Sequence, residues 1–419
     1  MSKTDGTRAE VDRQIELLAR RERPRLVAAL VSRLGYDDLA LAEDVAQDAL
    51  LRAMGHWPYA GIPENPGAWL QRVSWNRAID ELRRRARWVE DNAPEPASEF
   101  DLFMSRIPDP ELRLIFLCCH AELVERDQLA LTLQVTAGFT AREIASLLLV
   151  SEGQVSQRLA RLKRRLRSLQ QDAVIAPGHD EIEARVRVVV QVIYLMFALG
   201  FGPRSGGHVI RADVAREAIR LATDLAACET TSSPEVHALA AVLCLQGSRL
   251  EARTSAAGEP VMLSEQDRGL WDRELISRGL FHLMESQRAT ALSALHLEAG
   301  IAACHATAPS WEETDWRRIG WYYEKLRQAD TSPVVTMNHA VAVALAGDPA
   351  AAGAMVESLS DDARTRGYAP FYIARAEIRK LLGRDVASAE DYRRALTLDL
   401  SSPSAERLRQ RMAGAQLLG

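Results

Sequence analysis

Two helices joined by a short turn are predicted by residues 140–169, TAREIASLLLVSEGQVSQRLARLKRRLRSL. Thr140 and Ser151 each stand where a helix N-cap is expected, and Glu143 and Gln154 follow three residues later, which completes a capping box at each start. The second helix also carries an apolar stripe with steps of three and four residues, made of Val155, Leu159, Leu162, Leu166 and Leu169. The stretch therefore predicts a helix-turn-helix whose second helix docks on a core along one side.

The other side of this second helix is suited to DNA. Gln154, Arg158, Arg161 and Arg165 form a polar, cationic stripe, and a helix docked on a core can offer such a face to the major groove. Residues 158–167 contain six cations and no acid, whereas a merely solvated face more often alternates its charges. Capped helix pairs also occur in proteins that bind no nucleic acid, so the pattern favours DNA recognition and leaves a structural role open.

The charge of the whole chain limits DNA binding to local patches. The 419 residues contain 52 cations and 57 acids, a net charge of −5, so a general electrostatic attraction to nucleic acid is excluded. Residues 1–170 contain 25 cations and 25 acids, which leaves the excess of acids in the C-terminal part. A chain of this length is expected to form two or three domains.

Cysteine usage and hydropathy predict a cytoplasmic protein. The five cysteines are odd in number and scattered, which argues against a disulfide framework. Cys118, Cys119 and His120 are adjacent and would point apart on a helix, so buried thiols are favoured over a metal site. The first residues are polar, without a signal peptide, and the apolar run 188–201 is shorter than the ~20 residues of a spanning helix.

The chain is predicted to be all-α, since Ala, Leu, Arg and Glu dominate segments separated by Gly, Pro and Ser. Helices are expected at 11–34, 38–54 and 68–87, with a loop at 56–67, an acidic and proline-containing linker at 88–107, and two helices between 109 and 138.

Two of the predicted helices present polar faces. In the helix 38–54, an inward side of Ala42, Val45, Ala49 and Ala53 leaves Asp44, Gln47, Asp48 and Leu51 outward, which an ordinary solvated face also explains. The helix 68–87 ends in the cationic run RRRAR (83–87), which suits a helix C-terminus for dipole reasons alone. Beside an aromatic loop, however, a basic helix is also suited to stacking unpaired bases and gripping phosphates.

The C-terminal part is predicted to consist of about ten helices with an internal repeat. HAVAVALAGDPAAA (339–352) aligns with RAEIRKLLGRDVAS (375–388) at a spacing of 36, which matches Gly347 to Gly383. Helix hairpins with small residues at the crossing and a glycine turn look like tetratricopeptide-type repeats, whose usual period is ~34 residues. Such arrays are more often scaffolds for protein contact than enzymes.

Taken together, the chain resembles a bacterial RNA polymerase sigma factor of the extracytoplasmic-function type. AEDVAQDALLRA (42–53) and WLQRVSWNRAIDELRRRAR (69–87) resemble region two of that family, and residues 127–167 resemble its region four. The remainder resembles the subgroup with a fused helical-repeat extension. The resemblance implies a region-two domain (1–88), an acidic linker (89–107), a region-four helix-turn-helix domain (108–170) and a tetratricopeptide-like regulatory domain (178–419).

The resemblance also implies roles for single residues. Asp44, Gln47, Asp48 and Leu51 would bind the clamp of the polymerase β′ subunit, and region four would lie near the β flap. The minus-ten element would be opened and read by Trp57, Trp75, Asn76, Arg77, Asp80, Arg83 and Arg84. The minus-thirty-five element would be read in the major groove by Ser151, Glu152, Gln154, Ser156, Gln157, Arg158, Arg161 and Arg165.

The expected function is therefore that of an initiation factor that directs core RNA polymerase to particular promoters. An alternative is a DNA-binding activator with a tetratricopeptide-like sensor domain, although such a protein has no need of promoter-melting helices. An enzyme in residues 178–419 is disfavoured, because the chain contains no Walker loop, HExxH motif, glycine-rich dinucleotide turn or nucleophile elbow. His296, Cys304 and His305 are spaced too loosely for a recognisable metal site. No cofactor is expected.

Overall fold

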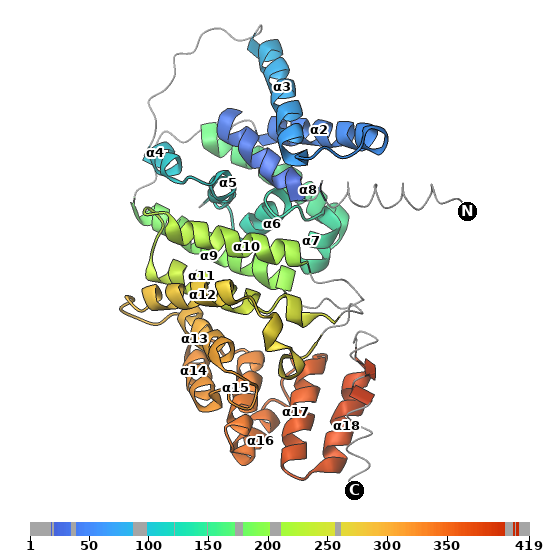
Figure 1. Ribbon diagram of the computed structural model, residues 1–419, viewed down its shortest axis with the longest axis vertical. Coiled ribbons are helices and arrows are strands. Elements are labelled where there is room, and N and C mark those ends of the chain that lie inside the picture. The colour runs from blue at the N-terminus through green and yellow to red at the C-terminus, as the bar shows by residue number, and fades with distance from the viewer. Residues whose placement is uncertain are drawn as a thin grey trace, which may run out of the picture. The chain divides into compact units, whose positions relative to one another are not determined.

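The structure, a computed structural model, is helical throughout its regular elements, as predicted (Figure 1). It describes residues 18, 21–34, 39–86, 99–120, 122–148, 150–171, 179–201, 211–255, 261–398, 405–406 and 408–409. The chain divides into two compact units, residues 1–196 with 227–231 and residues 197–226 with 232–419. The division falls inside a helix rather than at 170–178, and the predicted domain limits stay predictions.

Unit 1 begins, within the described residues, with a helix at 21–34, and further helices follow it along the chain. They are α2 (Leu39–Ala60), α3 (Pro66–Ala86), α4 (Glu99–Arg106), α5 (Pro110–Cys118), α6 (Glu125–Val135), α7 (Ala141–Leu148) and α8 (Glu152–Gln171), followed by the first part of α9 (His179–Phe201). In this unit α2 packs on α3, while α8 contacts α6, α7 and α2.

The predicted loop at 56–67 is wrong for its first five residues and its last two, since α3 begins at Pro66. Helix α2 continues to Ala60 and contains Pro58, which removes one backbone donor from the last turn and disfavours the helix. The buried side chain of Trp57 offsets this cost, since its ring packs edge-on against Trp69 with the centroids 5.4 Å apart. Gly61 ends the helix with a φ of 85° and donates to the carbonyl of Trp57 at 2.9 Å.

The predicted linker 88–107 is also wrong in part, because it contains helix α4. Phe103, Met104 and Ile107 are buried, and the Phe103 ring packs edge-on against Phe116 at 5.3 Å. These apolar contacts outweigh the acidic composition that suggested an open tether. Residues 87–98 lie outside the described part of the chain.

Cys118 and Cys119 are buried thiols, as predicted. All five are free and inaccessible. Burial raises the pKa of Cys119 to about 12 and the pKa of Cys118 well above its ordinary value. Thiols in this state are poor nucleophiles and poor metal ligands, and the described residues contain no group of three or more metal-ligating side chains.

Unit 2 contains the remaining helices. They are the end of α9, α10 (Ala212–Ala227), α11 (Pro234–Gly247), the 3-10 turns η2 (Glu251–Arg253), η3 (Leu263–Glu265) and η4 (Arg268–Leu270), then α12 (Arg273–Ser286), α13 (Ala294–Thr307), α14 (Trp316–Ala329), α15 (Pro333–Leu345), α16 (Pro349–Glu357), α17 (Ala369–Leu381) and α18 (Asp385–Leu396). From α13 onward each helix packs on the next one in sequence.

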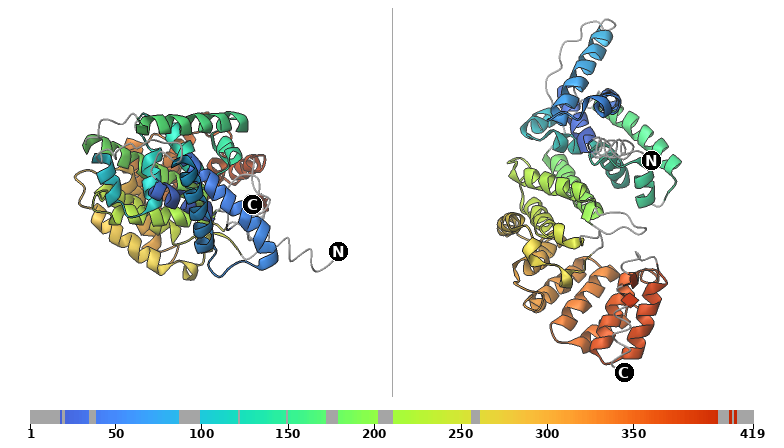
Figure 2. Two further views of the ribbon diagram at one scale, coloured as in Figure 1. Left: turned by 90° about the horizontal axis from the view of Figure 1, so that it is seen from above. Right: turned by 45° about the vertical axis from the view of Figure 1, so that its right-hand side comes forward.

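The internal repeat predicted near the C-terminus corresponds to two helix hairpins, α15–α16 and α17–α18 (Figure 2). Gly347 and Gly383, the matched glycines, both have positive φ, 102° and 69°, which permits the tight turn of each hairpin. The matched Ala340 and Ala376 are fully buried at the helix crossings. Glycine turns and small crossing residues thus play the same part in both hairpins.

Helix α9 is longer than the apolar run that was read from the sequence. Its stretch Ile182–Phe201 contains 20 residues and is long and apolar enough to cross a membrane by length and composition alone. Half of its most apolar window is buried within the protein.

Candidate nucleic-acid interface

The helix-turn-helix begins each of its helices with a capping box, as predicted. The Glu143 carboxylate accepts from the backbone N–H of Thr140 at 2.8 Å, and the Thr140 hydroxyl accepts from the N–H of Glu143 at 3.2 Å. Ser151 and Gln154 repeat this arrangement at the start of α8, with distances of 3.0 and 3.3 Å. Both helix starts are therefore fixed by side chains that the sequence places there.

The apolar stripe of α8 holds it on the core. Val155, Leu159, Leu162 and Leu166 are buried, as are Phe139 and Ile144 from the preceding turn and helix. The side chain of Leu169 lies outside the described residues. Burial along this one side leaves the opposite side of the helix to solvent.

The predicted DNA-reading side chains lie on that opposite side. Ser151, Glu152, Gln154, Ser156, Gln157, Arg161 and Arg165 are exposed. The amide oxygen of Gln154 already accepts a hydrogen bond from the backbone N–H of Ser151 in the capping box at the start of α8. Arg158 is only partly buried and is hydrogen-bonded to the Asp127 carboxylate of α6. The exposed face is thus polar and positively charged.

A cavity of about 250 Å³ lies beside α8 and is lined by both predicted and unpredicted residues. Gln154, Gln157, Arg158 and Arg161 come from the predicted face, and Arg126 of α6 joins them. Sequence reasoning missed Arg126, although its place in the helix before the helix-turn-helix was a signal that it could reach the same surface. Three guanidinium groups and two amides supply donors and acceptors that suit phosphates and base edges.

The cations of α8 are not all free for DNA. Lys163 donates to both carboxylate oxygens of Glu43 in α2, at 2.7 Å each. Arg165 pairs with Glu122 at 2.5 Å, and both side chains are about half exposed. For Arg161, Arg164 and Arg167, the described residues provide no acidic partner. The count of six cations therefore overstates the charge that α8 presents.

Helix α2 presents a mixed polar and apolar face. Asp44, Gln47 and Leu51 are exposed on it, as predicted. Met54 lies one turn beyond Leu51, and its side chain is equally exposed, at 55% each. Sequence reasoning missed Met54, although the spacing of three residues from Leu51 is a helical one. Exposed apolar side chains among polar ones form a surface suited to a protein partner.

Asp48 differs from the other residues predicted for this face. It is partly buried, and its carboxylate accepts from Arg77 of α3 at 3.3 Å. Arg77 was predicted to contact DNA and Asp48 to contact a protein, yet the structure joins the two across the α2–α3 crossing. Both side chains are still well exposed, so the pair contributes little to the packing of α2 on α3.

Helix α3 exposes a line of polar side chains. It begins with Pro66 after Asn65, whose amide oxygen accepts from the N–H of Ala68 at 3.0 Å. Asn76, Asp80, Arg83 and Arg84 are exposed, and Arg84 pairs with Glu81 at 2.5 Å. The spacing of Asn76, Asp80 and Arg83 places them along one side of the helix.

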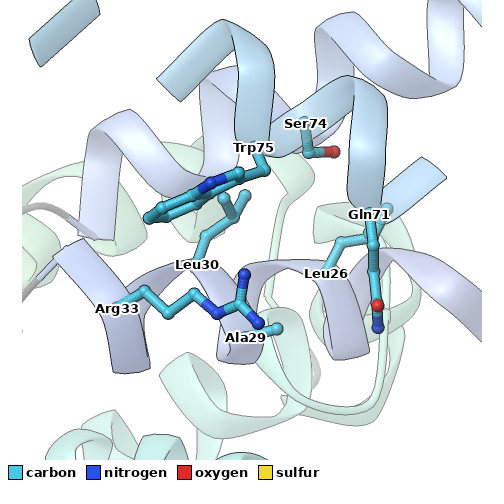
Figure 3. A pocket seen from close by; sticks show the side chains of 7 residues that line it. All are labelled: Leu26, Ala29, Leu30, Arg33, Gln71, Ser74 and Trp75. Atoms are coloured by element: carbon cyan, nitrogen blue, oxygen red, sulfur yellow. The ribbon is translucent and has the colours of Figure 1, made fainter. Parts of the chain in front are cut away.

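The two tryptophans predicted to act on DNA are not on this line. Trp57 is buried in α2, and Trp75 is partly buried where α3 crosses the helix at 21–34. Figure 3 shows the Trp75 ring beside the Arg33 side chain, whose guanidinium carbon lies 5.0 Å from the ring centroid. A cavity of about 70 Å³ is found here, which is room for a few water molecules.

Comparison with known proteins gives matches over both halves. Family models match at residues 18–88 (Sigma-70 region 2), 113–166 (Sigma-70 region 4) and 185–287 (a family of unknown function, DUF6596). The protein R00370 of Rhizobium meliloti, itself uncharacterized, is 35% identical over 407 residues, which are 95% of each chain. The ECF RNA polymerase sigma factor SigL of Mycobacterium tuberculosis is 32% identical over 132 residues, 31% of this chain and 75% of SigL. No solved structure matches.

Proposed function

Because this chain belongs to the extracytoplasmic-function sigma factors, with sigma-70 regions 2 and 4 and full-length similarity to R00370, we propose that it directs core RNA polymerase to specific promoters by two separate contacts with DNA. The observation that carries the proposal is the face of α8, whose start is fixed by two residues and whose outward side chains are polar and cationic. The protein performs no chemistry of its own.

The α8 face reads the minus-thirty-five element in the major groove. Gln157 and Arg161 are exposed and line the cavity beside the helix, so they are the best placed for base edges. An arginine or an amide side chain can bond a base edge with two hydrogen bonds. Arg165 and Arg158 exchange their present carboxylate partners for phosphates.

The α3 face reads the minus-ten element. Asn76, Asp80 and Arg83 are exposed on one side of a capped helix, and they can bond bases that have left the duplex. Unstacking a base costs a few kcal/mol, which contacts to its edge and to neighbouring phosphates must repay. Trp57 acts indirectly, since its burial against Trp69 fixes the end of α2 next to the start of α3.

The exposed face of α2 binds the clamp of the polymerase β′ subunit, while region four lies by the β flap. Leu51 and Met54 provide the apolar centre of the α2 face, and Asp44 and Gln47 provide its polar surroundings. An interface with an apolar centre and a polar rim is the usual composition of a specific protein contact.

The C-terminal helical region regulates the factor as a tetratricopeptide-like domain. The two similar hairpins α15–α16 and α17–α18 and the acidic balance of the C-terminal part support this role. The similarity to R00370 extends over 95% of both chains, so this region accompanies the sigma domains in a relative as well. The protein acts in the cytoplasm, where its polymerase and promoters are.

Run-off transcription with purified core polymerase and the full chain on genomic fragments tests the proposal. The chain is expected to confer start-site selectivity that the core enzyme lacks. The double variant Gln157→Ala/Arg161→Ala should lower transcription from the selected promoter at least about fivefold, the loss of one base contact worth ~1 kcal/mol or more. Arg393→Ala, an exposed arginine of α18, is the matched control and should change nothing.

The polymerase contact is tested by co-purification. Leu51→Asp should abolish retention of the chain by core polymerase, because it places a charge at the centre of an apolar contact. Met284→Asp changes a side chain of equal exposure in α12 and should leave retention unaltered. Retention of the Leu51→Asp variant at the wild-type level would refute the α2 assignment, and absence of start-site selectivity in the wild type would refute the function.

A further inference from the structure

Three arginines of unit 2 stack on aromatic rings around the turns that follow α11. The guanidinium carbons of Arg249 and Arg253 lie 5.1 and 3.8 Å from the centroid of the Phe201 ring. Arg268, at the start of η4, lies 4.6 Å from the centroid of Trp271. The turns η2 and η4 contact each other, so the three cations belong to one cluster.

The backbone holds one of these cations in place. Arg268 donates through Nη1 to the carbonyl of His305 at 2.6 Å and to the carbonyl of Ala308 at 2.8 Å. The His305 ring packs edge-on against Trp316, with the centroids 5.4 Å apart. Arg268 is therefore anchored to the end of α13, and Arg249 and Arg253 are anchored on Phe201. Positions fixed in this way remain in place without a ligand.

No carboxylate of the described residues forms a salt bridge with the cluster, although the charge of Glu312 partly offsets the burial that lowers the pKa of Arg268. None of the three arginines has a carboxylate within salt-bridge distance there, whereas Arg220, Arg375 and Arg379 of the same unit each have at least one. Glu251, the carboxylate nearest in sequence to Arg253, pairs instead with the exposed Arg216. Cations gathered away from bulk water without an anion are costly, because neither hydration nor a partner offsets their repulsion.

Several polar atoms of the cluster have no hydrogen-bond partner among the described residues. They are the buried donors Arg253 Nε and Arg268 Nη2 and the buried His305 Nδ1, which donates or accepts according to the ring tautomer. Buried polar atoms are nearly always paired in folded proteins, and an ion or water bound there is a usual explanation where they are not. Water or an anion can satisfy these donors, and the positive charges of Arg249 and Arg253, which no described carboxylate pairs with, favour an anion.

The charge state of the cluster strengthens this reading. Burial, with the neighbouring Arg253, lowers the pKa of Arg249 to about 9, and burial lowers the pKa of Arg253 to about 10. Both groups remain protonated at neutral pH. Burial and the charges of Arg249 and Arg268 lower the pKa of His305 to about 4, so its ring is neutral and adds no further cation.

We propose that Arg249, Arg253 and Arg268 form a binding site for the phosphoryl group of a small phosphorylated molecule. Guanidinium forks match phosphate oxygens with paired hydrogen bonds, and a phosphoryl dianion neutralises most of three positive charges where a single carboxylate would neutralise one. Arg268 Nη2 and Arg253 Nε are the unpaired donors that it would help to satisfy. This site concerns unit 2 alone and does not depend on the promoter function proposed above.

Thermal unfolding of the full chain with inorganic phosphate and pyrophosphate tests the site, with sodium chloride at equal ionic strength as reference. A ligand that binds only the folded state raises the unfolding temperature in proportion to the logarithm of its concentration above the dissociation constant. The wild type should show this rise with pyrophosphate and phosphate. An equal response to chloride would overturn the proposal.

Variants locate the effect. The double variant Arg253→Gln/Arg268→Gln should lose the rise, and Arg216→Gln, which removes an exposed arginine of the neighbouring ion pair, should keep it. Arg253→Lys retains the charge but not the fork, and should raise the apparent dissociation constant about tenfold or more. Circular dichroism in chloride checks folding. If the double variant does not fold, Arg253→Lys decides alone, and an unchanged dissociation constant for it would refute the site.

Discussion

Two arginines of α17, Arg375 and Arg379, and one arginine of α8, Arg165, make ion pairs of opposite kinds. Arg375 donates to both oxygens of Asp391 at 3.0 and 2.6 Å, and Arg379 donates to the same carboxylate at 2.8 Å. The Asp391 side chain is only 4% exposed. Arg165 of α8 pairs with Glu122 instead, with both side chains more than half exposed. Buried pairs are committed to the fold, whereas exposed pairs can exchange their carboxylate for another anion.

Surroundings rather than residue type produce this difference. Burial alone lowers the pKa of Arg375, but the hydrogen bonds and the charge of Asp391 outweigh it and raise the pKa. The Arg375 guanidinium also stacks on Phe371, 4.9 Å from the ring centroid. Arginine therefore supports helix packing in α17 and is available to a ligand in α8. Substitutions at buried pairs should accordingly change the free energy of unfolding more than substitutions at exposed pairs.

The largest effect is expected from Asp391→Ala. It leaves Arg375 and Arg379 partly buried with Glu357 as their remaining partner, and breaking a buried ion pair from one side costs about 3–5 kcal/mol. Urea unfolding followed by circular dichroism should show the loss. Glu251→Ala, which breaks the exposed pair with Arg216, is the control. Equal stability of the two variants would remove the distinction between buried and exposed pairs.

An intermediate effect is expected from Glu43→Gln. Glu43 is nearly buried and receives both hydrogen bonds of Lys163, so α2 and α8 are joined through it. An amide cannot neutralise the partly buried ammonium group, and the loss should be about 1–3 kcal/mol. Asp44→Asn changes an exposed carboxylate one residue away and should leave the urea midpoint unaltered. A Glu43→Gln midpoint equal to that of the control would contradict the assigned role.

Sequence patterns identified the features that depend on neighbours in the chain. The two capping boxes and the glycine turns at Gly347 and Gly383 rest on contacts within four residues or on a single φ angle. The buried side of α8 packs on other helices, but it is marked in the sequence by apolar residues at steps of three and four. Helical period and cap chemistry suffice to predict such features.

Features that depend on distant residues were missed. The extension of α2 past Pro58 depends on Trp69, and α4 depends on Phe116, which lies on the next helix. The pairing of α8 cations with Glu43, Asp127 and Glu122 likewise joins residues more than 30 positions apart. Local composition carries no signal for these contacts, because tertiary packing overrides propensity. The exposed face of α8 was therefore predicted from the sequence, but the positive charge available on it was not.

A smaller effect concerns acid. Glu357 accepts from Arg379 at 3.0 and 2.7 Å, and although burial alone raises its pKa, these contacts outweigh it and hold the pKa below the ordinary 4.5. A carboxylate with a lowered folded pKa stabilises the fold above its unfolded pKa, and this contribution disappears as the pH falls through the folded value.

The wild type should therefore lose more stability than Glu357→Gln when the pH is taken from neutral to about 3, with urea midpoints as the measure. Because Glu357 is partly exposed, high salt should reduce the difference. Parallel pH profiles for the two proteins would show that the pair with Arg379 contributes nothing.

The smallest effect on folding, and the sharpest contrast with Asp391→Ala, is expected from Arg165→Gln. Both members of its pair with Glu122 are exposed, so the urea midpoint should not change. Promoter binding by the holoenzyme should weaken, and the slope of log K against log salt should fall by about 0.9, the value of one phosphate contact. Glu122→Gln is the matched control, because it frees Arg165 and should strengthen binding slightly. An unchanged salt slope for Arg165→Gln would mean that Arg165 stays paired with Glu122 when the holoenzyme binds the promoter. The exposed pair would then be as fixed as the buried pairs of α17, which would contradict the contrast between them.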